Sequence, residues 1–462
     1  MERRRVGRVV VAIGAALAVI AGLGLSQAAG AADNSTETGS NFGKPTGQFK
    51  NLKEIAEPKN CNSPDPGISA NEIKIGSITP TSGPSATLSS ILDGIKARFA
   101  KANAENELGP RKLTLVNEDD AADTARNVTA AQKLVEDEKV FAILAESGAG
   151  DASGPYLNQQ KIPVVGWQLG LPVYGTYTNY FGMQNGNVKD IQTHYVARPI
   201  EAVKQLGAKK IAVIGNSTGN AATFAEQNAD SVKKTPGLKL VYKTTDIPPG
   251  TTEFGSVVDQ IKQSGADTVY TTMAVQDGIA LVNQMHQAGV TPKIIVFPGG
   301  YSPAVLNLPA FDNAYFSLEF KPLETTPEPH GMTEFKKWMA QTAPAVQLGQ
   351  PPMVGWISAE TMIEGIKAAG MNCPTRKAFI NNLRLVKNYT ADGFFPPLNF
   401  TDTFNRPFFC AYYIQVVNHQ FVPQFGGKQF CGTKEIVNNK ILKSIPSTTT
   451  TVASATTTST PS

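Results

Sequence analysis

The feature that most constrains the fold of this chain is a regular alternation of strand-like and helix-like segments. Between Asn71 and Tyr174, apolar runs of strand length at residues 73–78, 113–117 and 140–145 alternate with stretches of helical periodicity. Strands that alternate with helices in this way form parallel sheets, whose ligands gather at the carboxyl ends of the strands. The sequence therefore predicts an α/β fold.

The same alternation continues well beyond this first set of segments. Further strand-like apolar runs lie at residues 162–167, 210–214, 238–243, 268–272 and 293–297. Their spacing of roughly 25–30 residues matches βαβ units. The two sets, residues 71–184 and 189–298, predict two lobes, and the later segments at 314–320 and 353–370 must return to complete one of them.

The N-terminus has the pattern of an export signal. Arg3, Arg4, Arg5 and Arg8 precede an apolar run at residues 9–25, and small residues follow it. This pattern predicts a secretory signal peptide at residues 1–31. An uncleaved membrane anchor is the alternative, because the run approaches spanning length. No cysteine follows the run, so we expect an exported protein in the periplasm, cell envelope or medium that is not lipid-anchored through an N-terminal cysteine.

Two terminal segments lack the composition of a packed core. Residues 32–70 are polar and lack strong periodicity, and residues 436–462 end in a Ser/Thr-rich tract. Such segments bury too little apolar surface to offset the loss of chain entropy. We expect a flexible linker before the lobes and a disordered tail after them.

The chain has four cysteines, which an exported protein would oxidise. Four cysteines allow three connectivities. Cys410 and Cys431 flank two β-like runs that a hairpin would bring together, which favours the pairs Cys410–Cys431 and Cys61–Cys373. A metal site is the alternative, but no C-x-x-C spacing supports it.

The sequence offers no catalytic set. Residues 148–154 approach a dinucleotide-binding fingerprint, but the third glycine is one residue late and no acidic ribose partner follows. No G-x-S-x-G elbow is present, and the four histidines are scattered without metal-binding spacing. Asp119, Asp120 and Asp123 suggest a calcium site, but they lack a regular calcium-loop pattern, so a solvated loop is the better interpretation. We expect no enzyme activity, cofactor or metal.

Net charge says little about partners. The value of +4 includes four arginines of the predicted signal, so the mature chain would be near neutral. The sequence has no stripe of basic residues that would indicate binding to nucleic acid.

From Asn71 to about Gln424, the order of these segments resembles the type I periplasmic binding proteins, in particular the leucine/isoleucine/valine-binding branch of ABC transport. The segments that carry the resemblance are Ile73-Lys74-Ile75-Gly76, Asn117-Glu118-Asp119-Asp120, Ile162-Pro163-Val164-Val165, Lys210-Ile211-Ala212-Val213-Ile214 and Gly265-Ala266-Asp267-Thr268-Val269-Tyr270. The resemblance implies two doubly wound, Rossmann-like lobes joined by a three-crossing hinge, with a small polar solute closed between them and an ABC permease as partner. We expect a monomer with lobe 1 at residues 71–187 and 318–388, and lobe 2 at residues 188–317 and 389–435.

The resemblance also implies a set of ligand-binding residues. In the family, hydroxyl and backbone N–H groups after two first-lobe strands hold the carboxylate of an amino acid, and an acidic residue of the second lobe holds its ammonium group. The acidic position falls at Asp277, for which the cap of a helix at residues 278–287 is an alternative role. The expected ligand-binding residues are Ser82, Ser147, Gly148, Ala149, Trp167, Gln168, Gly170, Thr218, Asp277 and Tyr301.

The chain departs from the family pattern at two of these loops. It has Ser217-Thr218-Gly219 where the family has a tyrosine before a glycine, and bulky Trp167-Gln168-Leu169 where the family has a Ser/Thr-rich loop. Trp167 would suit an aromatic or amide-like ligand as well as a branched-chain amino acid, unless it is an ordinary core residue. The predicted function is solute binding by hinge closure. The alternatives are a sensory ectodomain and a cell-envelope protein that reuses the fold.

Overall fold

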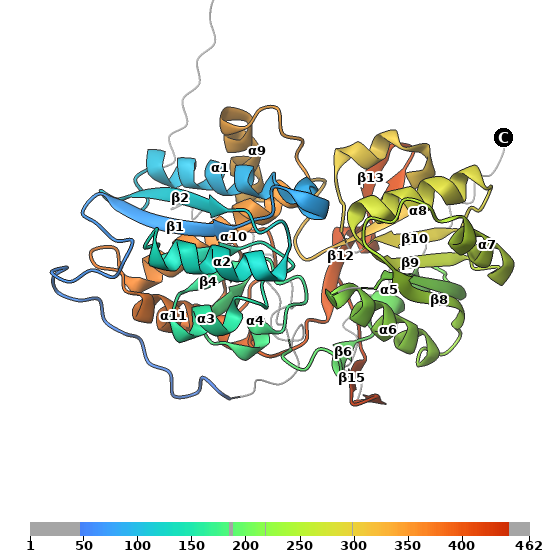
Figure 1. Cartoon of the computed structure of the whole chain (residues 1–462), viewed down its shortest axis with the longest axis horizontal. Helices are drawn as coiled ribbons and strands as arrows, with labels where there is room; N and C mark the ends of the chain where they lie inside the picture. The colour runs from blue at the N-terminus through green and yellow to red at the C-terminus, as the bar shows by residue number, and fades with distance from the viewer. Residues whose placement is uncertain (1–46, 184–187, 218, 298, 443–462) are drawn as a thin grey trace, which may run out of the picture. The chain divides into compact units, whose positions relative to one another are not determined.

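The computed structural model describes residues 47–183, 188–217, 219–297 and 299–442. The predicted signal peptide therefore lies outside the described residues. Within them, the first lobe is built on a five-stranded parallel sheet with the order β2-β1-β3-β4-β5 (Figure 1). Its strands are β1 (Glu72–Ile78), β2 (Lys112–Glu118), β3 (Ala142–Ala145), β4 (Val164–Gly166) and β5 (Tyr180–Gly182).

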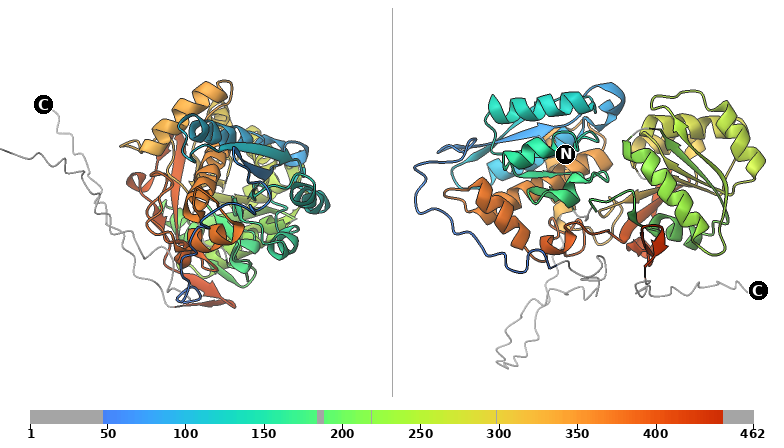
Figure 2. Two further views of the ribbon diagram at one scale, coloured as in Figure 1. Left: turned by 90° about the vertical axis from the view of Figure 1, so that its left-hand side faces the viewer. Right: turned by 60° about the horizontal axis from the view of Figure 1, so that its bottom comes forward.

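Helices lie on both faces of this sheet (Figures 1 and 2). Because side chains alternate along a strand, Leu144 and Val165 join the core cluster on one face, whereas Ile143 and Val164 join the cluster on the other. The helices are α1 (Ile91–Ala104), α2 (Thr124–Glu136), α3 (Gly154–Gln159), α4 (Val173–Thr176), α9 (His330–Thr342), α10 (Gln350–Ala369), α11 (Arg376–Leu385) and α12 (Phe400–Thr403). The apolar runs thus behave as the strands of a doubly wound sheet.

Helices α1 and α10 pack together through two glycines. A Cβ atom added to Gly94 would lie 1.9 Å from the carbonyl oxygen of Pro352, and one added to Gly355 would lie 1.9 Å from that of Ile91. The two backbones therefore approach more closely than any larger residue allows. This contact joins a helix near the start of the first lobe to one that the chain adds more than two hundred residues later.

Replacing Gly355 by alanine is expected to destabilise the protein, because the added methyl group would force α1 and α10 apart. Overpacking of this kind costs about 1–3 kcal/mol. Urea unfolding would measure the cost. Gly255→Ala is the matched control, since Gly255 begins α7 (Gly255–Ser264) and has open space around its Cβ position. Equal stability of the two variants would contradict the packing argument.

The second lobe contains an eight-stranded sheet with the order β13-β12-β11-β10-β9-β7-β8, in which β14 also pairs with β12. The central strands are parallel, and β12 runs antiparallel to β11 and β13. The strands are β7 (Lys210–Asn216), β8 (Lys239–Ile247), β9 (Thr268–Thr272), β10 (Ile294–Phe297), β11 (Ala314–Leu318), β12 (Cys410–Val417), β13 (Gln420–Pro423) and β14 (Phe430–Cys431). Helices α5 (Arg198–Gln205) and α6 (Gly219–Lys233) contribute to one core cluster beside the sheet, and α7 and α8 (Val275–Gln287) contribute to another.

Three segments connect the lobes, after β5, after β11 and before β12. The predicted lobe boundary at residue 388 does not match the contacts of the segment that follows it. The Tyr389 hydroxyl is 2.9 Å from that of Thr361 in α10, and Phe400 packs against Phe181 of β5. Residues 389–403 thus belong with the first lobe, because their aromatic side chains complete its core.

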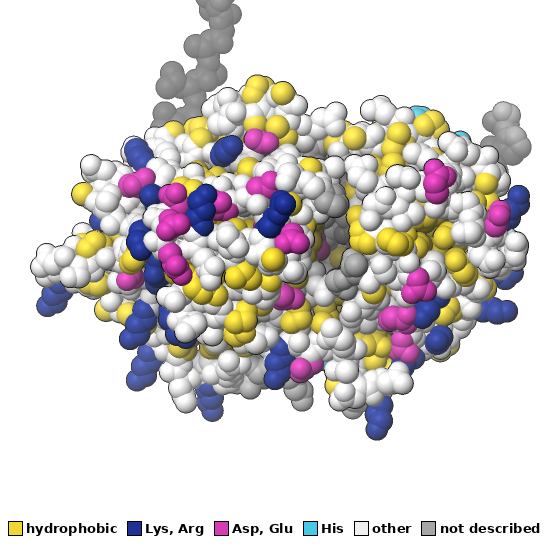
Figure 3. Space-filling model, in the orientation of Figure 1, with side chains coloured by type: hydrophobic (Ala, Val, Ile, Leu, Met, Phe, Trp, Pro, Cys, Tyr) yellow, Lys and Arg dark blue, Asp and Glu magenta, His cyan; other side chains and the backbone are white. Residues whose placement is uncertain are grey.

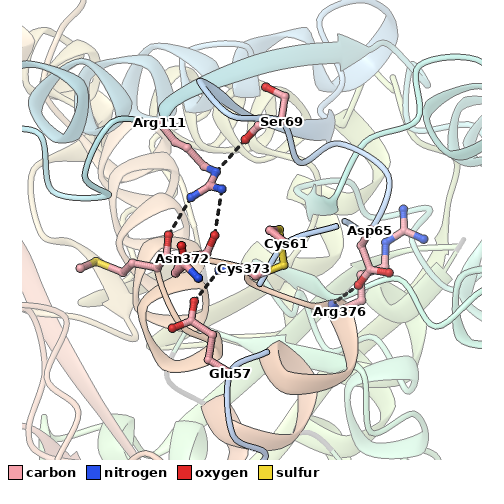
Figure 4. The surroundings of a disulfide bond; sticks show 9 residues. Glu57, Cys61, Asp65, Ser69, Arg111, Asn372, Cys373 and Arg376 are labelled. Atoms are coloured by element: carbon pink, nitrogen blue, oxygen red, sulfur yellow. Dashed lines mark hydrogen bonds between the residues drawn. A yellow bond between two sulfur atoms is a disulfide. The ribbon is translucent and has the colours of Figure 1, made fainter. Parts of the chain in front are cut away.

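Residues 47–70, part of the expected linker, are held against the first lobe (Figure 4). A disulfide joins Cys61 to Cys373, a pairing that the sequence favours. The Asp65 carboxylate accepts a hydrogen bond from the Arg376 backbone N–H at 2.6 Å, and Glu57 accepts one from the Cys373 N–H. The Arg111 guanidinium donates to the carbonyl oxygens of Ser69, Met371 and Asn372. These contacts correct the expectation of a free linker for this part of the segment.

The second disulfide joins Cys410 to Cys431 and bridges paired residues of β12 and β14. The chain then forms β15 (Glu435–Val437) and β16 (Lys440–Ile441), which build a three-stranded sheet with β6 (His194–Val196). Residues 436–442 were expected in the disordered tail, but the pairing of β15 with β6 fixes them. The rest of the predicted tail lies outside the described residues.

Candidate functional site

The strand order places the ligand-binding edge of each sheet. In a doubly wound sheet, ligands bind at the carboxyl ends of the strands, where the strand order reverses. This point lies between β1 and β3 in the first lobe and between β7 and β9 in the second. Ser82 follows β1 and Ser147 follows β3. Thr218, which follows β7, lies outside the described residues.

The loop after β3 presents its backbone to a ligand, whereas the hydroxyl group of that loop is already hydrogen-bonded. The Ser147 side chain is buried, and its Oγ accepts a hydrogen bond from the Ala149 N–H at 3.2 Å. Ala149 is also buried, whereas Gly148 is exposed, with open space around its Cβ position. A ligand at this edge would therefore meet the Gly148 backbone first.

The acidic residues after β2 fix the neighbouring loop. Asp119 accepts hydrogen bonds from the N–H groups of Thr81 and Ala121, both at 2.9 Å. Partial desolvation raises the pKa of Asp119, but hydrogen bonds from the Ser82 hydroxyl and these N–H groups outweigh it and hold the pKa below its ordinary value. Asp123 caps α2 by accepting from the Arg126 N–H. Asp119 and Asp123 therefore stabilise the backbone of the loop through its N–H groups. Among the described residues, no cluster of His, Cys, Asp or Glu could hold a metal ion.

Glu146, which directly follows β3, carries a buried carboxyl group and was not singled out from the sequence. Its Oε2 accepts a hydrogen bond from the Trp167 backbone N–H at 3.0 Å, and the Ser358 side chain also lies beside the carboxyl group. Burial raises the pKa of Glu146 to about 8, although the hydrogen bonds of Ser358 and Trp167 oppose the shift. The neutral carboxyl form is thus favoured at neutral pH.

Glu146→Gln is expected to make the protein less sensitive to pH. With a pKa of about 8 in the folded state against 4.5 ordinarily, Glu146 holds an extra proton in the folded state between these values. Its contribution to stability is therefore complete below pH 4.5 and is lost as pH rises through 8. Between pH 5 and pH 8, the wild type should lose about 2 kcal/mol or more relative to the glutamine variant. Urea unfolding across this range would measure the difference, and parallel curves would contradict it.

Trp167 lies between two carboxyl groups at the carboxyl end of β4. Its backbone N–H bonds to Glu146, and its indole N–H bonds to Glu319, which follows β11 of the second lobe. The Trp167 side chain is buried and belongs to the main hydrophobic core. It therefore ties the first lobe to a connecting segment as well as packing in the core.

The loop after Trp167 contacts the second lobe. The Asn220 side-chain amide of α6 donates to the Leu169 carbonyl oxygen at 3.4 Å. Gly170 has a φ of +72°, and a Cβ atom there would lie 2.1 Å from Cζ of Phe224, also in α6. The buried Gln168 side chain lies over Gly182 within the first lobe. Gly170 is thus required both by the backbone conformation and by the approach of the Phe224 ring.

Asp277 has internal partners on both carboxylate oxygens. Its Oδ2 accepts from the Asn216 side-chain amide at 2.8 Å, and both oxygens lie 3.1 Å from the Gly250 N–H. The suggested cap of a helix at 278–287 is wrong, because α8 begins at Val275 after Ala274. Asp277 instead lies in the first turn of that helix, where a negative charge is favourable.

Tyr301 is also engaged within the protein. Its hydroxyl donates to Glu324 at 2.7 Å and accepts from the Leu323 N–H at 3.1 Å, and its ring packs against Phe421. Tyr301 is fully buried. The side chain is therefore positioned as part of the second-lobe core.

A cavity of about 280 Å³ lies beside these loops. It is bounded by Leu169 and Gly170 from the first lobe, by β6, α5 and α6, by the ends of β9 and β11, and by the segment before β12. Its lining residues are Leu169, Gly170, Val188, Ile191, His194, Tyr195, Val196, Arg198, Pro199, Phe224, Gln227, Asn228, Tyr270, Thr272, Ser317, Glu319, Pro407 and Phe408. Of the expected ligand-binding residues within the described ranges, only Gly170 lines it. The other described ones lie in the switch-point loops or in the core.

The surface and the helices give two further observations. On the face shown in Figure 3, acidic and basic side chains are interspersed over the first lobe, without a patch of one sign. Throughout the described ranges, no helix is both long enough and apolar enough to span a membrane.

Two doubly wound lobes, connected by three segments and bearing loops at the carboxyl ends of their strands, define the type I periplasmic binding protein architecture. Residues 72–420 match the periplasmic binding protein family, and the chain belongs to that family. The predicted resemblance and fold are thus confirmed. The family consists of exported solute-binding proteins rather than enzymes.

Curated relatives include proteins named for the binding of leucine, isoleucine and valine. The chain is 27% identical over 240 residues to Leu/Ile/Val-binding protein homolog 7 of Brucella abortus, a match that covers 50% of this chain and 59% of the relative. The chain therefore spans about three fifths of the length of the curated relatives it matches.

Solved structures share the fold at low identity. A fatty acid ABC transporter substrate-binding protein from Thermomonospora curvata has a TM-score of 0.66 and 18% identity, covering 83% of this chain and 95% of that protein. An ABC transporter solute-binding protein from R. palustris, in complex with 4-hydroxybenzoate, has a TM-score of 0.62 and 20% identity, covering 81% and 98%.

Proposed function

We propose that this chain is the extracytoplasmic solute-binding protein of an ABC transporter and binds a small molecule between its lobes by hinge closure. The observation that carries the proposal is the cavity, because its lining combines Leu169 and Gly170 of the first lobe with Phe224 and Thr272 of the second. A ligand that touches both lobes has a higher affinity for the state in which they meet, and this difference drives closure. The closed form would then be recognised by a membrane permease.

Several classes of small molecule are candidate ligands in this proposal. The relatives and neighbours carry names that refer to branched-chain amino acids, fatty acids and 4-hydroxybenzoate, so the family accommodates several chemistries. Branched-chain amino acids and related amino acids, amides and aromatic compounds are all candidates here. The exposed backbone of Gly148 would meet the part of a ligand that extends from the cavity toward β3.

In this proposal, the second-lobe residues that contact the ligand are those lining the cavity, and Asp277 is not one of them. The Asp277 carboxylate already accepts three hydrogen-bond contacts within its own lobe. An incoming ammonium group would have to displace the Asn216 amide or the Gly250 N–H. Asp277→Ala should therefore lower the thermal stability of the free protein and leave the order of ligand affinities unchanged.

A thermal-shift screen of amino acids, amides, ureas, fatty acids and aromatic acids tests the proposal. A ligand at one hundred times its dissociation constant should stabilise the protein by about 2.7 kcal/mol. Calorimetric titration of each hit would give the stoichiometry, which we expect to be one ligand for each chain. Failure of every compound class to raise the melting temperature would favour an envelope protein that reuses the fold.

A further inference from the structure

The charges of the cavity point to a particular class of ligand. Arg198, at the start of α5, is the only lysine or arginine among the lining residues, and Glu319 is the only acid. Most other lining side chains are apolar or aromatic, including Phe224, Tyr270 and Phe408. The site therefore has few charged groups, and the partners of each one determine which ligand charge the cavity favours.

Arg198 is a cation without an acidic partner. Its Nη1 donates to the Cys410 carbonyl oxygen at 3.0 Å, and its side chain also lies beside the Tyr413 hydroxyl. No carboxylate of the described residues lies within ion-pair distance of it. A guanidinium placed among apolar groups is costly unless an anion satisfies it, and its planar donors match a carboxylate.

Within the described residues, Glu319 makes no ion pair with Arg198. Burial raises the pKa of its carboxyl group, although Arg198 and the Trp167 indole N–H oppose the shift. The Nε2 atom of His194, another lining residue, already lies 2.5 Å from the Glu435 carboxylate of β15. The cavity thus has one permanent cation, Arg198, and one carboxyl group, Glu319, whose pKa is raised by burial.

We propose that the cavity selects an apolar monocarboxylate, an aromatic or branched aliphatic acid without an amino group, whose carboxylate pairs with Arg198. The aromatic and aliphatic walls would bury the body of such a ligand. A zwitterionic amino acid fits less well, because its ammonium group would lose its water without gaining a carboxylate partner. This inference rests on the proposed function and narrows it.

Matched ligands test the charge preference directly. The probes are 4-methylpentanoate, leucine and 4-methylpentanamide, with 3-phenylpropanoate, phenylalanine and 3-phenylpropanamide as an aromatic series. Isothermal titration calorimetry should show that each acid binds about tenfold or more tightly than the amino acid and amide of the same skeleton. Tighter binding of leucine or phenylalanine would overturn the inference and leave the proposed function intact. Binding of other compounds but none of these six would also overturn it, and a chain that binds no solute at all would end both proposals.

Variants of the charged residues test the assigned contact. Arg198→Gln should weaken binding of the preferred acid about tenfold or more, and Arg198→Lys should restore part of that loss. Arg126→Gln is the matched control, because Arg126 is exposed on α2 of the first lobe. If Arg198→Gln fails to fold, the lysine variant and the six-ligand series still test the pairing of the ligand carboxylate with Arg198. Unaltered acid binding by Arg198→Lys, together with no preference of the wild type for the acids, would refute that pairing.

Discussion

Replacing Gly170 by valine is expected to weaken ligand binding about a hundredfold or more. The φ of +72° at Gly170 is strained for any other residue, and a β-branched side chain suffers most. The added Cβ would also lie 2.1 Å from the Phe224 ring of α6. The loop after β4 would then be unable to lie against the second lobe, so a ligand would lose one wall of the cavity.

Two comparison variants separate the effects of strain and contact. Gly289→Val introduces a side chain at a φ of +66° with open space around it, so it should cost stability but not affinity. The double variant Gly170→Val/Phe224→Ala removes the ring that the new side chain meets, so it should recover part of the lost affinity. Calorimetry with a ligand identified by the screen would compare them. Wild-type affinity in Gly170→Val would show that this interlobe contact has no part in binding.

Removing the Cys61–Cys373 disulfide is expected to give the largest loss of stability. The bond closes a loop with a sequence separation of 312, whereas Cys410–Cys431 spans 21. In the chain-entropy model, these loops correspond to about 5–6 and about 3 kcal/mol at 25 °C. Cys61→Ser/Cys373→Ser should therefore unfold at a lower denaturant concentration than Cys410→Ser/Cys431→Ser.

The same variant should loosen the N-terminal segment. Without the disulfide, residues 47–70 are held by hydrogen bonds such as those of Asp65 and Arg111. Limited proteolysis should cut this segment in the serine double variant before it cuts the lobes. An equal loss of stability in the two serine double variants would contradict the argument from loop length.

Most of the fold followed from local sequence patterns. Apolar runs with strand length predicted β1, β7, β9 and β10 within a few residues, because each is buried on both faces. Short strands such as β5 and β15 were missed, since three residues carry no measurable periodicity. The Cys61–Cys373 disulfide was predicted, but the hydrogen bonds that hold residues 47–70 on the first lobe were not, because they depend on partners more than 300 positions away, such as Arg376 and Asn382.

The candidate site was predictable only at the level of its loops. Alternation and resemblance directed attention to the carboxyl ends of the strands, where Ser147 and Gly170 lie. The partners of Asp277 could not be read from sequence, because Asn216 and Gly250 approach it only after β7 and α8 come together. Arg198 and Glu146 carry no sequence motif. Their importance comes from the burial of Glu146 and from the place of Arg198 in the cavity wall, which are properties of the folded chain.

Small-angle X-ray scattering of the full chain, with and without a saturating ligand from the screen, tests the central claim most directly. If the solute is held between two lobes that close around it, the radius of gyration should fall on binding, and Gly170→Val should reduce that fall at equal ligand occupancy. Tight stoichiometric binding with an unchanged radius of gyration would contradict the account.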